Sequence, residues 1–205
     1  MSGRVVDVAP ERIEGWLGRF ADQHGELSWQ AWPDRMLATA ADGAVADCEV
    51  PFPPLGSSTG LAAHAVRERR VGVLLVRLGG YAAGIFTGST LVASKVGSRY
   101  VHGRNAAGGQ SQQRFARRRD GQARVALEEA ADVAVRVLLP AVRDLDAVVL
   151  GGDRRAVATV VADPRLSDVR SLVVPRLLDV PDPRLRILQQ TPPLFRAVRV
   201  TVTDP

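Results

Sequence analysis

Residues 97–119 read GSRYVHGRNAAGGQSQQRFARRR, and this stretch separates two well-patterned parts of the chain. It contains four glycines and has no apolar periodicity before Phe115. A segment of this kind cannot bury itself, so we expect a long flexible loop over residues 97–122 that becomes ordered when a partner binds. The paired glycines Gly108 and Gly109 allow backbone conformations closed to other residues and would present Gln110 at the tip.

Regular secondary structure is predicted on both sides of this loop. A three-stranded meander precedes it, at residues 71–77, 81–86 and 90–96. A long helix, a strand, a second helix and a further strand follow it, at residues 123–139, 146–150, 154–162 and 169–174. The strand-helix-strand order implies a partly parallel sheet. The predicted fold class is therefore α/β, with a mixed β-sheet flanked by helices.

The first 60 residues are predicted to form a helix and a hairpin that extend this core. Apolar residues at helical spacing indicate the helix over residues 11–23, and Asp42-Gly43 is a typical hairpin turn between strands at 36–41 and 44–50. A last strand at 197–202 would add at a sheet edge. With 205 residues, of which 46% are hydrophobic, we expect one compact domain spanning residues 1–205.

The positive charge of the chain is concentrated around the loop. Residues 97–124 hold seven arginines and one acidic residue, a net charge of +6, whereas the rest of the chain carries −1. Arg114, Arg117 and Arg118 lie three and four residues apart, so on a helix they would share a face and could grip successive phosphates. This segment is therefore predicted to bind a polyanion.

Other kinds of site find little support in the sequence. The single cysteine, Cys48, cannot form an internal disulfide, and the three isolated histidines do not make a metal cluster. The first 16 residues carry charges throughout, and the longest aliphatic run is far shorter than a membrane span. We expect a cytoplasmic protein without a membrane segment, metal or cofactor.

Three motifs in and beside the loop stand in a fixed order: His102-Gly103-Arg104, Gly108-Gly109-Gln110-Ser111 and Arg114-Phe115-Ala116-Arg117. In this order they resemble the central catalytic domain of eukaryotic and archaeal class I translation release factors. They are similar in particular to the bacterial release-factor-like peptidyl-tRNA hydrolases of ribosome rescue and quality control. The resemblance covers roughly residues 70–175 and implies a release-factor central-domain-like, ribonuclease-H-like topology. Asn105-Ala106-Ala107 stands as an apparent insertion between the first two motifs.

The resemblance implies a peptidyl-tRNA hydrolase that frees nascent chains from tRNA on stalled large ribosomal subunits. Stop-codon recognition is not expected, since the residues upstream of the meander contain no recognisable codon-reading domain. The implied partners are peptidyl-tRNA and the ribosomal RNA of the peptidyl transferase centre, bound by a monomer. The implied catalytic residues are Gln110, Gly109 and Gly108. The implied RNA-binding residues are His102, Arg104, Ser111, Arg114, Arg117, Arg118 and Arg119.

Two other functions are compatible with the same residues. One is an endonuclease that cuts peptidyl-tRNA near its 3′ end, and the other is a non-catalytic ribosome-binding module that uses the basic segment. A nucleotide site at Gly151-Gly152 is less well supported, because the glycine and lysine pattern of a phosphate-binding loop is absent.

Overall fold

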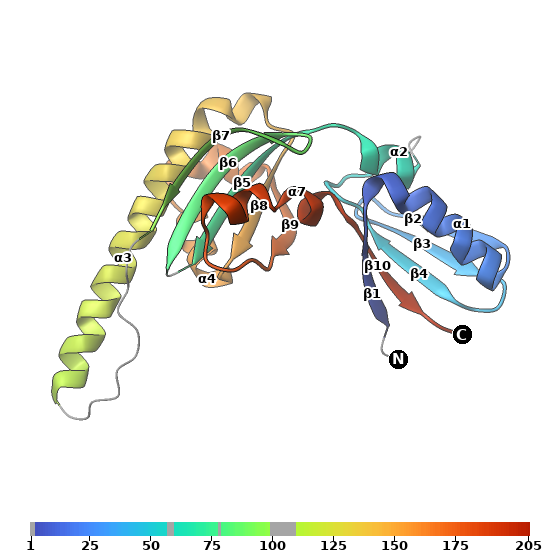
Figure 1. Cartoon of the computed structure of the whole chain (residues 1–205), viewed down its shortest axis with the longest axis horizontal. Coiled ribbons are helices and arrows are strands. Elements are labelled where there is room, and N and C mark those ends of the chain that lie inside the picture. Colours follow the sequence, from blue (N-terminus) through green and yellow to red (C-terminus); the bar gives the residue numbers. More distant parts are fainter. Residues whose placement is uncertain (1–2, 57–59, 78, 99–109) are drawn as a thin grey trace. The chain divides into compact units, whose positions relative to one another are not determined.

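The structure is a computed structural model that describes residues 3–56, 60–77, 79–98 and 110–205, and only the backbone over residues 110–120. Its contacts divide the chain into two compact units, where the sequence predicts one. Unit 1 comprises residues 1–68 and 192–205, and unit 2 comprises residues 69–191. Each unit has a hydrophobic cluster of its own, which is the physical reason for the division. Figure 1 shows the elements of both units.

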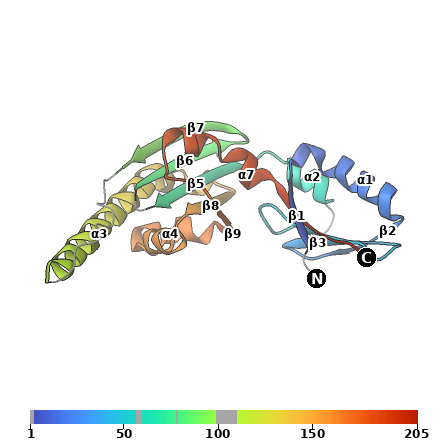
Figure 2. The same ribbon diagram turned by 60° about the horizontal axis from the view of Figure 1, so that its bottom comes forward.

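Unit 1 is a five-stranded antiparallel sheet with helices on one face (Figure 2). The strand order is β1-β10-β4-β3-β2. Its elements are β1 (Arg4–Val8), η1 (Pro10–Arg12), α1 (Ile13–His24), β2 (Leu27–Ala31), β3 (Arg35–Ala40), β4 (Val45–Glu49), α2 (Leu61–Val66), α7 (Pro192–Arg196) and β10 (Val198–Thr203).

Small side chains on the covered face of this sheet allow the helices to approach closely. Ala38, Ala46 and Cys48 are fully buried there, beneath Ile13 of α1 and Leu61 of α2. The helix and the hairpin predicted from the sequence are both present, and Gly43 adopts a φ of 95° in the hairpin turn. The strands β1 and β2 and the helix α2 were not predicted.

Unit 2 is a mixed five-stranded sheet in the order β7-β6-β5-β8-β9. The first three strands form the predicted antiparallel meander, whereas β8 and β9 run parallel to β5 and to each other. Its elements are β5 (Arg70–Arg77), β6 (Gly80–Thr87), β7 (Thr90–Gly97), α3 (Gln110–Leu138), η2 (Leu139–Asp144), β8 (Ala147–Gly152), α4 (Arg154–Val161), η3 (Pro164–Leu166), α5 (Ser167–Ser171), β9 (Val173–Leu178) and α6 (Leu185–Gln189).

The central strands of unit 2 are buried on both faces. Helices α3 and α4 contact the strands on one face, and α6 lies against β6 and β7, with Leu188 next to Gly84. In β5, for example, the consecutive residues 71–76 are all buried. A mixed sheet flanked by helices, as predicted, therefore describes unit 2, and the chain as a whole contains two sheets rather than one.

Two predicted strands at the C-terminal side need correction. Residues 167–171, which overlap the strand predicted at 169–174, form α5, and the strand β9 starts only at Val173. The strand predicted at a sheet edge is β10, and it lies between β1 and β4 of unit 1. Val198, Val200 and Val202 face the core of unit 1, which explains why the strand is interior.

Candidate functional site

The helix α3 carries the basic segment. It begins at Gln110 and runs for 29 residues, so residues 110–122 of the predicted loop are helical and the helix predicted at 123–139 is longer than expected. Glutamine, arginine and alanine are good helix formers, and within residues 110–122 only Gly121 opposes a helix. The missing apolar periodicity suggests a loop, but a helix needs that periodicity only where it packs against a core.

The structure places some of the predicted site residues and not others. Gln110 is the first residue of α3, and Ser111, Arg114, Arg117, Arg118 and Arg119 follow in its first three turns. Arg114, Arg117 and Arg118 stand three and four residues apart on this helical backbone. The remaining predicted residues lie outside the described part of the chain; they are His102, Arg104, Gly108 and Gly109.

The second half of α3 anchors this segment to the sheet through small side chains. Ala130, Ala131, Ala134 and Leu138 are almost completely buried, and the helix contacts β5, β6 and β7. Alanine at successive positions facing the sheet lets the helix axis approach the strands closely. Among residues 121–138 of α3, whose burial is described, Ala126 is the first buried residue.

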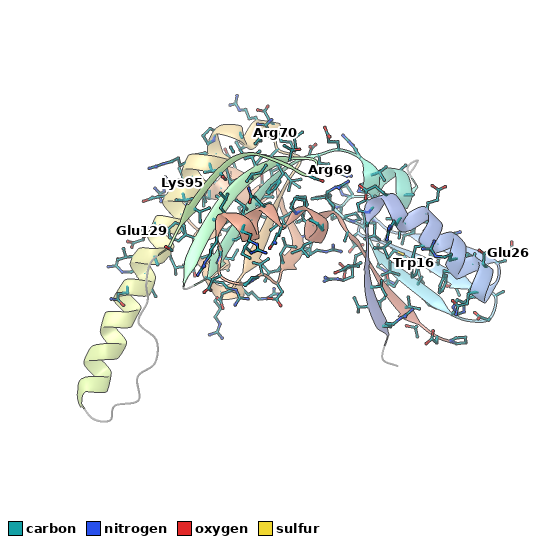
Figure 3. The ribbon with its side chains drawn as sticks, viewed as in Figure 1. Trp16, Glu26, Arg69, Arg70, Lys95 and Glu129 are labelled. Atoms are coloured by element: carbon teal, nitrogen blue, oxygen red, sulfur yellow. The ribbon has the colours of Figure 1, made fainter. Side chains whose placement is uncertain are left out.

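A hydrogen bond ties α3 to the sheet near the end of β7. The Tyr81 hydroxyl on β6 donates to Oε2 of Glu129 on α3 at 3.0 Å, and Figure 3 labels Glu129 on the helix. Tyr81 is paired across the sheet with Gly97, the last residue of β7. A Cβ atom on Gly97 would lie 2.5 Å from the Tyr81 hydroxyl and closer still to two ring carbons. The tyrosine ring thus occupies the space that a side chain at position 97 would fill. We call Tyr81, Gly97 and Glu129 together the α3 root.

The α3 root was not predicted from the sequence. Tyr81 and Glu129 are 48 residues apart, and no spacing signal connects a strand residue with one particular helix residue at that distance. Only the absence of a side chain at Gly97 offers a hint, and glycine occurs at the ends of strands for several unrelated reasons, such as a bulge or a bend.

An ion-pair network holds α3 from a second side. The Arg165 guanidinium donates to Asp132 of α3 at 2.8 Å and to Asp163 at 2.8 Å. Asp163 also accepts from the backbone N–H of Arg165 and so caps η3. The Arg165 side chain and this backbone hydrogen bond lower the pKa of Asp163. Asp163 therefore keeps its charge at neutral pH.

The glycines at the end of β8 have a packing role. Gly152 has a φ of 101°, and a Cβ there would collide with the carbonyl oxygen of Val76. Asp153 then caps α4, since its Oδ1 accepts from the backbone N–H of Ala156 at 2.8 Å. The strand-turn-helix junction thus accounts for these residues without a ligand.

Two of the histidines are already engaged inside unit 1. Nδ1 of His24 lies 2.8 Å from Asp42, and Nε2 of the buried His64 lies 2.8 Å from the Pro51 carbonyl oxygen. In the described part of the chain, no group of three or more histidine, cysteine, aspartate or glutamate residues is arranged to hold a metal ion. Nor is any helix among the described residues long and apolar enough to cross a membrane.

Gln110, the arginines of α3 and the mixed sheet that anchors this helix all lie in a region that matches a known family. The model of one protein family, described as the Actinobacteria/chloroflexi VLRF1 release factor (acVLRF1), matches residues 69–201. That range is about two thirds of the chain and includes all of unit 2. The chain therefore belongs to the acVLRF1 release-factor family.

Solved structures that resemble part of this chain include the crystal structure of the archaeal translation termination factor aRF1. The two chains share 15% sequence identity with a TM-score of 0.47, over 78% of this chain and 51% of the archaeal one. A second structure, described as an archaeal protein, shares 17% identity with a TM-score of 0.40, over 75% and 48% of the two chains. The chain thus spans about half the length of either structure. No curated protein matches the chain.

Proposed function

We propose that this protein hydrolyses the ester bond between a nascent peptide and tRNA on stalled large ribosomal subunits, without reading a stop codon. One observation carries the proposal. The last residue of the Gly108-Gly109-Gln110 motif is the first residue of a long basic helix, in a chain of the VLRF1 release-factor family. The strand order of unit 2, with three antiparallel strands followed by two parallel ones, is consistent with the ribonuclease-H-like topology that the motifs imply.

In the proposed hydrolysis, Gln110 positions the reacting groups and does not transfer protons. A glutamine amide does not titrate, so Gln110 cannot act as an ordinary general base. A water molecule attacks the ester carbonyl carbon, and the bond from that carbon to the ribose 3′ oxygen breaks. One proton of the water passes to the ribose oxygen, and the other is released to solvent when the new carboxylic acid ionises. The products are a peptide with a free carboxylate and a tRNA with an intact 3′ hydroxyl.

The N-terminal end of a helix is suited to stabilising the oxyanion that develops during hydrolysis. The first N–H groups of an α-helix have no partner within the helix and point out of its N-terminal end. At Gln110 they would be available to a developing oxyanion, and Gly108-Gly109 would let the backbone approach the ester. One oxyanion donor is typically worth about 3–4 kcal/mol. Correct placement of the reacting groups can contribute about 7–11 kcal/mol.

The arginines supply the contact with ribosomal RNA. Arg114, Arg117 and Arg118 lie on one side of α3 within three turns of Gln110. Their spacing on a helix matches contacts to neighbouring phosphates, which position a protein on RNA without reading its sequence. His102, Arg104, Ser111 and Arg119 are proposed to add further RNA contacts. The protein is proposed to act as a cytoplasmic monomer that needs no cofactor.

Single-turnover release from peptidyl-tRNA bound to isolated large subunits tests the proposal. The native chain should release peptide without a small subunit, messenger RNA or stop codon. Gln110→Ala should slow release by about two to three orders of magnitude, the loss expected for a few kcal/mol of transition-state stabilisation. Gln113→Ala, the same change one turn further along α3, is the matched control and should release at the native rate. Both variants should still pellet with large subunits.

The same reaction separates the other two functions. Analysis of the tRNA 3′ end shows whether the ester or the RNA was cut, and a tRNA that has lost its terminal nucleotides would identify an endonuclease. A chain that binds large subunits but releases nothing would be a binding module. Equal rates for native protein and Gln110→Ala would refute the catalytic role of the glutamine.

A further inference from the structure

The charges of the chain are distributed unequally between the two units. Unit 1 contains seven arginines and eleven acidic residues, a net charge of −4. Unit 2 contains the other 20 basic and 11 acidic residues, a net charge of +9. Unit 2 is therefore the part suited to RNA, whereas unit 1 would be repelled by a phosphate backbone. Residues 1–68 also precede the region matched by the family.

Unit 1 contains an apolar groove of about 570 Å³ on the helix-covered side of its sheet. The start of α1 and the helix α2 form its walls, and β2 and β3 contribute Trp29 and Met36. Trp29 lies on the same face as the buried core but at the edge strand β2, where the helices leave it 43% exposed. Val66 at the end of α2 is 47% exposed. Both residues line the groove, which we name the Trp29 groove.

Two carboxylates stand at this groove. Glu11 and Glu14 line it from η1 and α1, and no arginine or lysine of the described residues is among those that line it. Glu11 accepts hydrogen bonds from its own backbone and from Arg196, which lower its pKa. Glu14 is exposed. An apolar floor with carboxylates beside it is complementary to a segment that combines apolar and basic side chains.

We propose that the Trp29 groove docks a short segment of a partner protein in which aliphatic or aromatic side chains are flanked by arginine or lysine. The apolar side chains fill the space between Trp29, Met36 and Val66, and the basic ones lie beside Glu14, since Glu11 is already paired with Arg196. The acidic charge of unit 1 attracts such a partner and disfavours RNA. This interaction does not depend on peptide hydrolysis, which is assigned to α3 of unit 2.

Selection of random twelve-residue peptides on the immobilised full chain tests the site. Selected peptides are then synthesised with a fluorescent label, and their binding is measured by anisotropy. We expect the selected peptides to be enriched in apolar residues next to arginine or lysine. Failure to enrich any peptide over a protein-free surface, or enrichment of acidic peptides, would overturn the proposal.

Matched variants show whether these peptides occupy the groove. Trp29→Ala and Val66→Glu should each weaken binding by about tenfold or more, since they alter the apolar anchors. Val5→Glu is the control, because Val5 is 57% exposed on β1 and does not line the groove. Its affinity should stay within about twofold of native. Equal affinity of Val66→Glu and the native chain would contradict the docking site.

Charge reversal tests the role of the carboxylates. Glu14→Arg should weaken binding by about 3- to 10-fold at low salt, with a smaller effect at about 0.5 M salt. Asp22→Arg makes the same change of net charge elsewhere on α1 and should have little effect. Release activity on isolated large subunits should be native in Val66→Glu. Two other results would overturn the proposed partner. Self-association that is lost in Val66→Glu would make a second copy of the chain the occupant of the groove, and RNA binding that is lost in Trp29→Ala would make it RNA.

Discussion

Replacing Gly97 by alanine is expected to disrupt the α3 root. The new Cβ would lie 2.5 Å from the Tyr81 hydroxyl and closer to the ring, whereas ordinary van der Waals contact begins near 3.4 Å. The ring must therefore retreat by about 1 Å, and its 3.0 Å hydrogen bond to Glu129 must lengthen or break. No unusual backbone conformation is involved, because Gly97 is not among the residues with positive φ.

The size of the effect follows from two contributions. Inserting a methyl group into a filled space typically destabilises by about 1–3 kcal/mol. A hydrogen bond to a charged acceptor contributes about 1.5–3 kcal/mol, of which only part is lost because Glu129 is partly accessible to water. We expect about 2–4 kcal/mol in total. For a unit of this size, one kcal/mol lowers Tm by about 4 °C, so Tm should fall by about 8–16 °C.

Thermal unfolding of a double-mutant cycle tests this reasoning. Tyr81→Ala is destabilising in its own right, but it removes the ring that Gly97→Ala would strike. In the Tyr81→Ala background, Gly97→Ala should therefore change Tm by no more than about 2 °C. If Gly97→Ala is as damaging there as in the native chain, or is harmless in both, the clash between Gly97 and Tyr81 is not what fixes the root.

Two further outcomes follow from charge. Binding to large subunits should weaken steeply with salt, and Arg117→Ala with Arg118→Ala should reduce the slope by about 0.7–0.9 logarithmic units for each phosphate that the protein no longer neutralises; a double variant with native affinity at every salt concentration would contradict this. Asp163→Asn should destabilise unit 2 by at most about 1 kcal/mol at pH 7, because the neutral amide can still cap η3 but no longer forms an ion pair with Arg165. The folded-state pKa of Asp163 lies below its ordinary value of 3.8, so its contribution is complete above pH 4 and is lost as the pH falls through the lower value. The Tm difference between native protein and Asp163→Asn should shrink below pH 4, and a constant difference from pH 7 to pH 2 would refute the assignment.

The sequence predicted those elements whose signals are local. The meander and the hairpin at Asp42-Gly43 are set by turn residues and periodicity, and both are present. The order of the motifs around Gln110 also predicted a release factor, and the match to the family confirms it. These features depend on residues within a few positions of one another.

Features that depend on distant contacts could not be predicted. Strand β10 pairs with β1 and β4 across more than 150 residues, so its valines indicated a strand but not its place in unit 1. The division into two units was missed for the same reason. The sequence pattern predicts a loop at Gln110, because its neighbours show no apolar periodicity. The helix nevertheless extends to Gln110, because these residues have good helix propensity and the second half of α3 is anchored to the sheet.

The path of β10 bears on the order in which the chain can fold during synthesis. Among the described strands β1 pairs only with β10, and Cys48 of β4 lies opposite Val200. The whole of unit 2 is synthesised before β10, so it can close while unit 1 still lacks an interior strand. Burial, with the nearby Asp47 charge, raises the pKa of the Cys48 thiol to about 12 in the finished fold.

Chains stopped before Val198 should therefore react quickly with a thiol alkylator at about pH 8, near the ordinary pKa of a free thiol, whereas the full chain should not. Equal rates would show that unit 1 forms without β10. During synthesis, unit 2 with its proposed RNA-binding segment can thus fold before unit 1, whose groove is proposed to bind a protein partner. A newly made chain would then pass through a period in which it can bind RNA but not that partner.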